Sequence, residues 1–445
     1  MDDAPSCGDK GADEFPARVV SANGPCINAA RCGAAKSFAE SRQRLMCRAC
    51  FADAVMHQFR RGLQLVKPVK RSGTTPLVVA FSGGVASSAL LDMCARLLQQ
   101  DARKVHFSCH VVWIDCLDVL PVSPEQAQTI RADIAAAVEK RGFESFRRIP
   151  LCAAFSRGSL APDEQGSCMV RLKHAFGGSR PMVSWKEALL DVLVRSLLIR
   201  YAQSVDSHRV VVGDTMTRMS VKLFGSLSRG VGSNAGSLVS PVDAVSFGPL
   251  DVMIVRPLSS MTSKELGLYN RAVQTADIVV VPSFSTQALD KKHSLDLLSE
   301  TFLLTLQDAH DHTLPTLVRA ANKIDPADDT YFCKEWAHCM GCDPELKKVL
   351  QARSLDANAA LAARCQLCLL VKADTQSVGK GCCQSECASG CGDKPQLCRK
   401  CTLLTSEMEA ENGTKAAEVV VSYRDEVRAK IADYLLSSDD DEDGE

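Results

Sequence analysis

Residues suited to binding phosphate follow an apolar run in the first quarter of the chain. Three serines, Ser82, Ser87 and Ser88, flank the glycine pair Gly83 and Gly84. Glycines permit backbone conformations in which successive amides point at an anion, and serine hydroxyls at a helix N-terminus add donors. The segment predicts a phosphate-binding turn between a strand and a helix. The same residues would also suit an ordinary turn.

This turn resembles the pyrophosphatase-type nucleotide loop of enzymes that adenylate a substrate, usually written Ser-Gly-Gly-x-Asp-Ser. The chain has Ala86 where those enzymes have the aspartate. A methyl group cannot offer a carboxylate to metal-bound phosphate or accept a proton. The resemblance implies a phosphate-binding ancestry and leaves open whether ATP and Mg²⁺ still bind.

A second set of polar residues follows a later apolar run. Gly213 and Asp214 end that run, and Arg218 and Lys222 are spaced to share one face of the helix expected next. If both turns lie at one edge of a sheet, these side chains face the same space. The pattern fits contact with the phosphate of a nucleotide or a nucleic acid, and it fits a solvated basic face equally well.

Asp115 ends a third apolar run and is a further candidate for the nucleotide site. An aspartate at a strand end is also a common turn former. Cys116 follows directly. We interpret it as an inert thiol, because nothing in the sequence indicates a lowered pKa.

The N-terminal region contains a candidate metal site. Cys47 and Cys50 have the two-residue spacing that lets both sulfurs reach one metal, and Cys26 and Cys32 upstream would complete a tetrahedral set. His57 is an alternative ligand. We predict a structural zinc site in this region.

The C-terminal region contains eleven of the 21 cysteines. Two correctly spaced pairs, separated by a longer loop, predict a zinc-ribbon-like site: Cys365, Cys368, Cys398 and Cys401. The remaining cysteines would allow a second metal site, with an unassigned ligand set: Cys333, Cys339, Cys342, Cys382, Cys383, Cys387 and Cys391. An iron–sulfur cluster is the less favoured alternative to zinc.

Basic residues cluster between the first cysteine module and the Ser-Gly-Gly turn. They are Arg60, Arg61, Lys67, Lys70 and Arg71. Such a cluster fits an electrostatic contact with the RNA backbone, or a solvated linker. Aromatic residues make up only 5% of the chain, so the sequence does not favour recognition of single strands by stacking.

Apolar runs alternate with segments of helical spacing through the middle of the chain. The predicted strands are 77–81, 105–115, 145–151, 208–214, 252–257 and 277–282, and the predicted helices are 88–100, 124–141, 185–203, 216–227 and 262–274. Residues 152–183 lack a clear period and resemble an insertion. Alternating strands and helices predict an α/β fold with a doubly wound, mainly parallel sheet. Binding then belongs at the carboxyl ends of the strands.

Composition and charge suggest several domains. We expect a cysteine-rich module at 1–60, an α/β domain at 74–310, a cysteine-rich module at 330–405, a helix at 406–436 and an acidic tail at 437–445. Residues 439–445 hold six acids and no base, which is typical of a solvated tail. The sequence shows no secretory signal and no apolar run of about 20 residues, so we predict a cytosolic protein without membrane contact.

Taken together, the motifs resemble those of the family of second subunits of the cytoplasmic tRNA 2-thiolation complex. The matching segments are Cys-x-x-Cys-Phe at 47–51, Ser-Gly-Gly-x-x-Ser at 82–87, Gly-Asp-x-x-Thr-Arg-x-x-x-Lys at 213–222, Arg-Pro-Leu at 256–258, Lys264-Glu265, Tyr269-Asn270-Arg271, the paired C-terminal cysteines and the acidic end. The resemblance implies an adenine nucleotide alpha hydrolase-like fold. It also implies a catalytic first subunit as heterodimer partner.

What the resemblance implies about function is sulfur transfer to tRNA. A ubiquitin-like carrier would deliver sulfur as a thiocarboxylate to the wobble uridine of tRNA Lys, Glu and Gln, giving the 2-thiouridine of mcm5s2U. Seven basic residues become candidate tRNA contacts: Arg60, Arg61, Lys67, Lys70, Arg71, Arg218 and Lys222.

Departures from the catalytic relatives point to a partner subunit with little or no catalysis of its own. Those relatives have an Asp-Asp pair where this chain has Thr217-Arg218, and reactive cysteines where residues 279–284 and 152–183 supply none with the expected spacing. Two alternatives remain. One is an independent adenylating ligase or amidotransferase, and the other is a zinc-dependent scaffold without an RNA role.

Overall fold

The computed structural model describes most of the chain up to residue 323 and a few residues near 405. The described residues are 24–33, 36–41, 44–64, 75–100, 107–156, 160, 166–177, 183–228, 239–245, 252–275, 278–284, 294–310, 312–321, 323, 401–402, 404–406 and 409. Nearly all of the predicted C-terminal module, helix and acidic tail therefore lies outside them. Within the described part of the chain, no helix combines the length and apolar character needed to cross a membrane.

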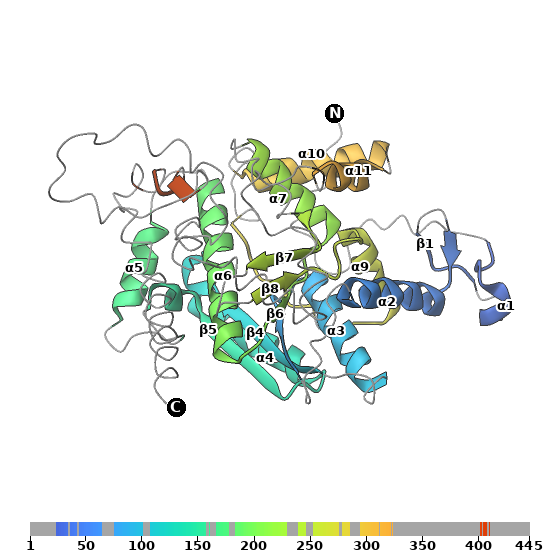
Figure 1. Ribbon diagram of the computed structural model, residues 1–445, viewed down its shortest axis with the longest axis horizontal. Helices are drawn as coiled ribbons and strands as arrows, with labels where there is room; N and C mark the ends of the chain where they lie inside the picture. Colours follow the sequence, from blue (N-terminus) through green and yellow to red (C-terminus); the bar gives the residue numbers. More distant parts are fainter. Residues whose placement is uncertain are drawn as a thin grey trace, which may run out of the picture.

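A six-stranded sheet forms the centre of the fold (Figure 1). In chain order its strands are β3 (Thr75–Ala80), β4 (Phe107–Asp115), β5 (Ser145–Pro150), β6 (Arg209–Val211), β7 (Val242–Val245) and β8 (Val252–Val255). The order across the sheet is β5-β4-β3-β6-β8-β7, and every neighbouring pair is parallel except β7 and β8. The predicted mainly parallel, doubly wound sheet is confirmed.

Strands β3 and β6 are neighbours in the sheet although they are far apart in the sequence. From β3 the chain winds toward β4 and β5, whereas from β6 it winds the other way, toward β8. The strand order thus reverses between β3 and β6, which is where ligands bind in sheets of this type. The turns that begin at Ser82 and Gly213 follow these two strands and meet at this point.

Helices cover both sides of the sheet (Figure 1). They include α3 (Val85–Gln100), α4 (Pro124–Glu139), α6 (Ser184–Ser204), α7 (Met216–Ser228) and α9 (Ser263–Ala272). Helix α6 contacts β4, β6 and β8, and α3 packs against α9. Thr262 caps α9, as its sequence predicts, in a capping box with Glu265. Ser123 caps α4 in the same way.

Two further helices extend this fold beyond the last strand. They are α10 (Leu295–Ala309) and α11 (Thr313–Ala321), and both pack against α7. Small apolar clusters hold them there, one of which contains Val221, Leu303 and Leu314. Helix α10 matters for the site because it brings Asp296 to α7.

The N-terminal module docks against α9. It consists of α1 (Ala29–Cys32), the hairpin β1 (Ala39–Ser41) and β2 (Arg44–Met46), and α2 (Arg48–Gln64). Ser41 Oγ donates a hydrogen bond to Glu265 Oε1 over 2.9 Å. Gly62 lies so close to Pro257 that a Cβ atom would be 2.7 Å from its Cα. These two contacts fix the module on the α/β domain.

Three segments differ from the prediction. Residues 278–284 are not a strand, because β7 occupies the sheet edge beyond β8 and the Val279 amide instead donates to the Gly83 carbonyl. The sequence did not reveal β7. The insertion at 152–183 is partly helical, with the 3-10 helix η2 (Leu151–Phe155) packed against α5 (Ser167–Ala175).

Candidate functional site

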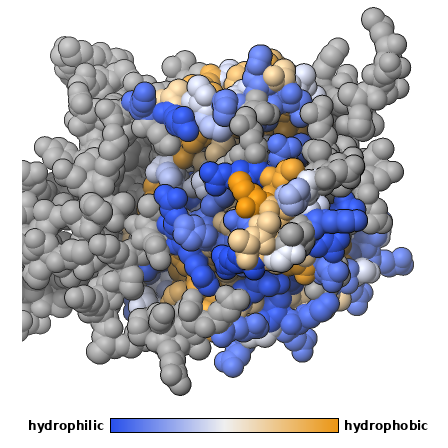
Figure 2. Space-filling model, turned by 90° about the vertical axis from the view of Figure 1, so that its right-hand side faces the viewer, coloured by the Kyte–Doolittle hydropathy of each residue, from blue (hydrophilic) through white to orange (hydrophobic). Residues whose placement is uncertain are grey.

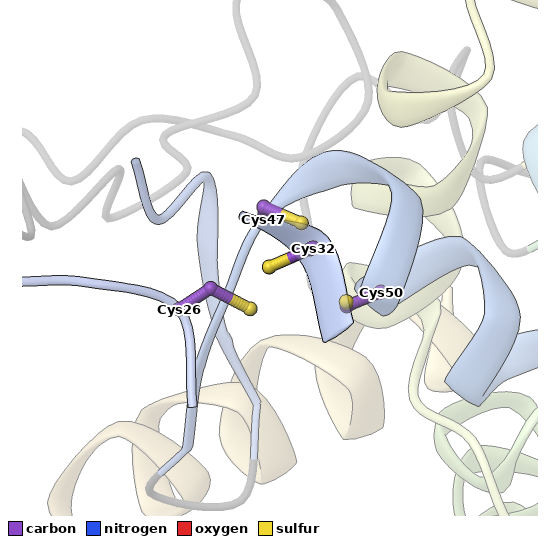
Figure 3. A group of neighbouring side chains, drawn as sticks. All are labelled: Cys26, Cys32, Cys47 and Cys50. Carbon is purple, nitrogen blue, oxygen red and sulfur yellow. The ribbon is translucent and has the colours of Figure 1, made fainter. Parts of the chain in front are cut away.

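Four cysteines of the N-terminal module point toward one another (Figure 3). Cys26 precedes α1 and Cys32 ends it, whereas Cys47 precedes α2 and Cys50 lies in the first turn of that helix. Their Sγ atoms all lie within 4.8 Å of one another. Zinc–sulfur bonds of about 2.3 Å in a tetrahedron place sulfurs about 3.8 Å apart. A small contraction of this cluster would therefore let it hold a metal ion.

The thiols of the cluster differ in acidity. Burial raises the pKa of Cys26, but hydrogen bonds from the backbone at Cys47 and Asn28 and from neighbouring thiols bring it down to about 7. Burial and the adjacent sulfur of Cys47 raise the pKa of Cys50 to about 12. Four closely spaced thiolates, three of them buried, would repel one another, and a bound cation removes that repulsion. The surroundings thus fit a metal ion.

His57 is not part of this cluster. It is an exposed residue of α2, and the four cysteines supply four sulfur donors without it. Four thiolates suit zinc, and they also suit an iron–sulfur cluster. The donor set therefore supports the binding of a metal ion or cluster that prefers sulfur ligands.

The serine hydroxyl groups of the Ser-Gly-Gly turn form hydrogen bonds within the turn. Ser87 Oγ donates to the Gly84 carbonyl over 3.0 Å and accepts a hydrogen bond from the Ser82 amide over 3.2 Å. Ser88 Oγ donates to the Gly83 carbonyl over 3.0 Å. Ser87 and Ser88 are buried, and Ser82 is exposed. The serines thus stabilise the shape of the turn, and only Ser82 reaches its outer surface.

Gly83 is the position in this turn that requires glycine. Its φ of +85° lies in the left-handed region. A Cβ atom there would lie 2.7 Å from the Ile134 side chain and 3.2 Å from Val279. The sharp turn is therefore packed between α4 and the segment that contains Val279.

The Gly213 turn packs directly on the start of α3. A Cβ atom at Gly213 would lie 3.2 Å from the Ser87 backbone and 3.3 Å from the Ala86 carbonyl carbon. The structure thus brings together the two predicted turns. Ala86, which stands in place of the aspartate of adenylating enzymes, lies where they meet.

Asp214 forms the centre of an ion-pair network beside these turns. Its carboxylate lies 3.4 Å from Lys222 Nζ and 3.3 Å from Arg256 Nε, and Arg256 is only 5% exposed. Burial raises the pKa of Asp214, but Lys222 and Arg256 outweigh it and hold the pKa below its ordinary value. Asp214 is therefore ionised and neutralised within the chain.

The two bases of α7 are also paired with acids. Lys222 Nζ lies 3.1 Å from Asp191 Oδ1, in addition to its contact with Asp214. Arg218 lies 3.5 Å from Asp296 of α10. Internal ion pairs thus engage both side chains, and contact of Arg218 and Lys222 with a phosphate stays a prediction.

Asp115 is held by three partners at the end of β4, one of which is Arg148, whose Nε lies 3.8 Å from Oδ2. Its Oδ1 accepts a hydrogen bond from the Leu117 amide over 3.1 Å, and its Oδ2 accepts one from Arg131 Nε over 2.6 Å. Both carboxylate oxygens are thus engaged in the turn between β4 and α4. This geometry fits the turn-forming role that the sequence also allows, and a nucleotide contact of Asp115 stays a prediction.

Cys116 is a poor nucleophile in this environment. Burial and the negative charge of Asp115 raise its pKa to about 12. The thiol therefore stays protonated near neutral pH, in agreement with the expectation from the sequence.

Several motif residues on or beside α9 form hydrogen bonds that link the Ser-Gly-Gly turn and its following helix to the rest of the domain. Asn270 Nδ2 donates to the Val85 carbonyl over 2.9 Å, at the first residue of α3. The Tyr269 hydroxyl donates to Asp92 Oδ2 over 2.8 Å. Thr217 accepts a hydrogen bond from the Ser263 amide over 3.2 Å. These motif residues thus have structural contacts of their own.

The N-terminal module and its following linker are strongly basic, and the cluster predicted from the sequence contains only part of this positive charge. Residues 24–71 hold ten lysines and arginines and only two acids, whereas the whole chain has 52 bases and 53 acids. Four exposed bases of this module precede the cluster first considered: Arg31, Lys36, Arg44 and Arg48. Counting charge in a window would have found them. Figure 2 shows this side of the molecule, where hydrophilic side chains surround a small apolar patch.

The remaining predicted residues divide between described and undescribed parts of the chain. Arg60 and Arg61 lie near the end of α2, with Arg61 exposed. Outside the described residues lie Lys67, Lys70, Arg71, Cys365, Cys368 and Cys398. Cys401 is described and buried.

Comparison with known proteins places these features in context. No protein-family model matches the sequence. Over 474 residues the chain is 26% identical to "Cytoplasmic tRNA 2-thiolation protein 2" of Danio rerio, which covers 89% of this chain and 91% of the relative. The Homo sapiens protein of the same name is 23% identical over 483 residues, covering 90% and 91%. These relatives confirm the resemblance that the motifs indicate.

A solved structure also shows similarity. It is the U34-tRNA thiolase NcsA from Methanococcus maripaludis with its 4Fe-4S cluster. The TM-score is 0.46 at 12% sequence identity, and the match covers 63% of this chain and 82% of that chain.

Proposed function

We propose that this protein is a cytoplasmic subunit of the machinery that 2-thiolates tRNA, and that it contributes structure and tRNA contacts rather than catalysis. The role in tRNA 2-thiolation is supported by relatives of that name that match about nine-tenths of the chain. The partner-subunit role depends on one observation. The charged residues predicted for the nucleotide site are engaged by ion pairs within the chain.

The chemistry requires groups that this sheet edge does not offer. Adenylation of the uridine C2 oxygen needs ATP, a metal-binding carboxylate and a pathway for the phosphates. Here the turn has Ala86, Asp214 is neutralised by Lys222 and Arg256, and Arg218 is paired with Asp296. A catalytic first subunit would therefore adenylate the uridine. The thiocarboxylate sulfur of a ubiquitin-like carrier would then attack C2 and displace AMP, and hydrolysis of the acyl–sulfur bond would release the carrier as its carboxylate and leave 2-thiouridine.

The N-terminal module would supply the tRNA contact. Its excess of positive charge suits the phosphate backbone, which dominates the affinity of proteins for nucleic acids. The tRNAs would be those that carry 2-thiouridine at the wobble position, tRNA Lys, Glu and Gln. Arg60, Arg61, Lys67, Lys70 and Arg71 continue the basic region toward the α/β domain.

A structural zinc ion would hold this module together. Cys26, Cys32, Cys47 and Cys50 would bind it, and a closed set of four thiolates is typical of structural rather than catalytic zinc. Bound zinc would supply folding free energy and leave no open position for a substrate. The C-terminal cysteines Cys365, Cys368, Cys398 and Cys401 would form a second structural site.

Reconstitution tests the proposal. We would measure ATP-dependent 2-thiouridine formation by this chain alone, by its catalytic partner alone and by both together. We expect turnover that depends on the partner and is increased by this chain. Robust turnover by the isolated chain, together with tight Mg-ATP binding, would overturn the proposal in favour of an independent adenylating ligase or amidotransferase.

Charge reversal separates the proposal from a scaffold without an RNA role. The variant Arg60→Glu with Arg61→Glu should weaken tRNA binding by the complex and flatten its salt dependence. A matched variant, Arg147→Glu with Lys173→Glu, reverses two exposed bases outside the N-terminal module and should leave binding intact. Unaltered tRNA affinity after reversal at Arg60 and Arg61 would favour the scaffold.

A further inference from the structure

A cavity of about 420 Å³ lies between the cysteine module and the α/β domain. Its wall is formed by Asn28 and Arg31 beside the cysteine cluster, by His57 and Arg60 of α2, and by Arg96 and Tyr269 of α3 and α9. Cys50 also lines it, so the cavity adjoins the candidate metal site. No motif in the sequence indicates this cavity, because its walls come from segments far apart in the chain.

Arg96 is held at the cavity wall by a partly buried network. Its Nε donates to Asp92 Oδ2 over 2.7 Å, and the same oxygen accepts a hydrogen bond from the Tyr269 hydroxyl over 2.8 Å. Burial lowers the pKa of Arg96, but Asp92 outweighs this and raises it. The guanidinium is therefore a fixed, permanently charged part of the wall.

Arg31, at the mouth of the cavity, forms an exposed ion pair that an anionic ligand could replace. Arg31 lies 3.3 Å from Asp53, and their side chains are 78% and 65% exposed. An exposed pair of this kind contributes little stability because water and salt screen it. An incoming phosphate group could therefore take the place of Asp53 beside Arg31.

The composition of the wall selects among ligands. Three arginines and His57 face one acid, Asp53, so the cavity favours an anion. Ala52, Ala54 and Met56 add apolar surface on α2, which a simple phosphate would not use. Guanidinium groups beside apolar surface are suited to an unstacked RNA base with its phosphate. The volume lies within the range of about 300–1,000 Å³ found for small-ligand sites.

We propose that this cavity accepts one unstacked nucleotide of a bound RNA strand, with its base inside and its phosphate at the mouth beside Arg31. This inference rests on the proposed function, because it requires tRNA to lie across the basic module. The cavity would then contribute selectivity for a nucleotide that is splayed out of its stack. The surrounding arginine and lysine side chains would contribute affinity for RNA regardless of its sequence.

The test fills the cavity without changing its charge. The full-length, metal-loaded chain would be titrated with fluorescently labelled tRNA and with a fully paired RNA duplex of similar length. Ala54→Phe places a ring in the cavity and should weaken tRNA binding about tenfold, the scale of losing one stacked base. The slope of affinity against salt should stay the same, because no phosphate contact is removed. Duplex binding should not change.

Matched variants guard against misfolding. Ala49→Phe adds the same ring at an exposed position of α2 and should bind tRNA as the unaltered chain does. Arg31→Gln removes the positive charge at the mouth of the cavity without filling it, and should reduce the salt slope by about one. If Ala54→Phe unfolds, Arg96→Gln provides the second test, with an expected several-fold loss for tRNA and none for the duplex.

The outcomes distinguish the two proposals. If the unaltered chain and its complex bind no tRNA, the proposed function fails. If they bind tRNA and neither Ala54→Phe nor Arg96→Gln weakens that binding, the cavity proposal alone is overturned. Competition by free UMP or AMP as effective as that by a single-stranded oligonucleotide would also overturn it, because the cavity would then take a free nucleotide.

Discussion

Charged side chains are arranged differently at the sheet edge that carries the Ser82 and Gly213 turns and in the N-terminal cysteine module. At the sheet edge, Asp214, Arg218 and Lys222 are each engaged by an opposite charge within the chain. The cysteine module instead carries a large excess of positive charge on its surface and four thiols that suit a cation. The charged groups at the sheet edge are paired with one another, whereas the module presents exposed positive charges outward.

The largest effect is expected from removing the proposed metal ion from the cysteine module. Cys47→Ser with Cys50→Ser should abolish metal binding at this module and unfold it, because structural zinc supplies much of the folding free energy of such small units. Metal content by mass spectrometry should fall by one ion, because the proposed C-terminal site keeps its own metal, and tRNA binding should be lost. Cys109→Ser, which lies outside the cluster, should retain both. Full metal content in the double variant would contradict the assignment.

At the sheet edge, removing one charge should destabilise the fold. Asp214→Asn leaves Arg256, only 5% exposed, without its counter-charge and should lower the free energy of unfolding by about 3 kcal/mol. Asp296→Asn is the matched control, because its partner Arg218 has a side chain that is 46% exposed. That variant should lose at most about 1 kcal/mol. Urea unfolding compares the two, and equal losses would contradict the difference in burial.

Gly62 tests how firmly the two regions are joined. Gly62→Ala places a Cβ 2.7 Å from Pro257 Cα, so α2 must shift, at a cost of about 1–3 kcal/mol. Gly267→Ala on α9 meets no atom within 4 Å and should be neutral or stabilising by about 0.5–1 kcal/mol. Thermal unfolding measures both. A Gly62→Ala variant as stable as Gly267→Ala would show that the docking of α2 is loose.

The smallest expected effect is a pH dependence at the sheet edge. The pKa of Asp214 is lower in the folded chain than its ordinary value, so its ion pairs stabilise the fold above that ordinary value. This stabilisation is lost as the pH falls through the lowered pKa. The difference in unfolding free energy between the unaltered chain and Asp214→Asn should therefore be full at pH 7 and shrink below about pH 4. A difference that stays constant in acid would contradict the ion pairing.

Much of the fold could be predicted because local signals agree with one another. The apolar runs and helical spacings gave most strands and helices, and Thr262 marked the start of α9. The prediction of a strand at 277–282 was wrong because a short apolar run has the same pattern whether it joins a sheet or packs against a turn. Here β7 already occupied the edge, and no local pattern reveals which strand takes an edge.

The candidate site shows the same division. Cysteine spacing indicated Cys26, Cys32, Cys47 and Cys50, because two pairs with short inner gaps can reach one metal. The partners of Arg218 and Lys222 could not be inferred, since Asp296 and Asp191 come from other helices. The basic surface was in the composition of residues 24–71 and needed only a count of charges.

The sequence by itself determined the chemistry that each segment can offer: glycine-rich turns after apolar runs, paired thiols and a basic stretch before the first strand of the sheet. Only the tertiary structure decided which of these groups meet. It placed β6 beside β3 and paired the charged side chains at the sheet edge with one another. It also enclosed a cavity between α2 and α3. The reason is physical: residue types and spacing are local properties, whereas strand order and ion pairing depend on how distant segments pack.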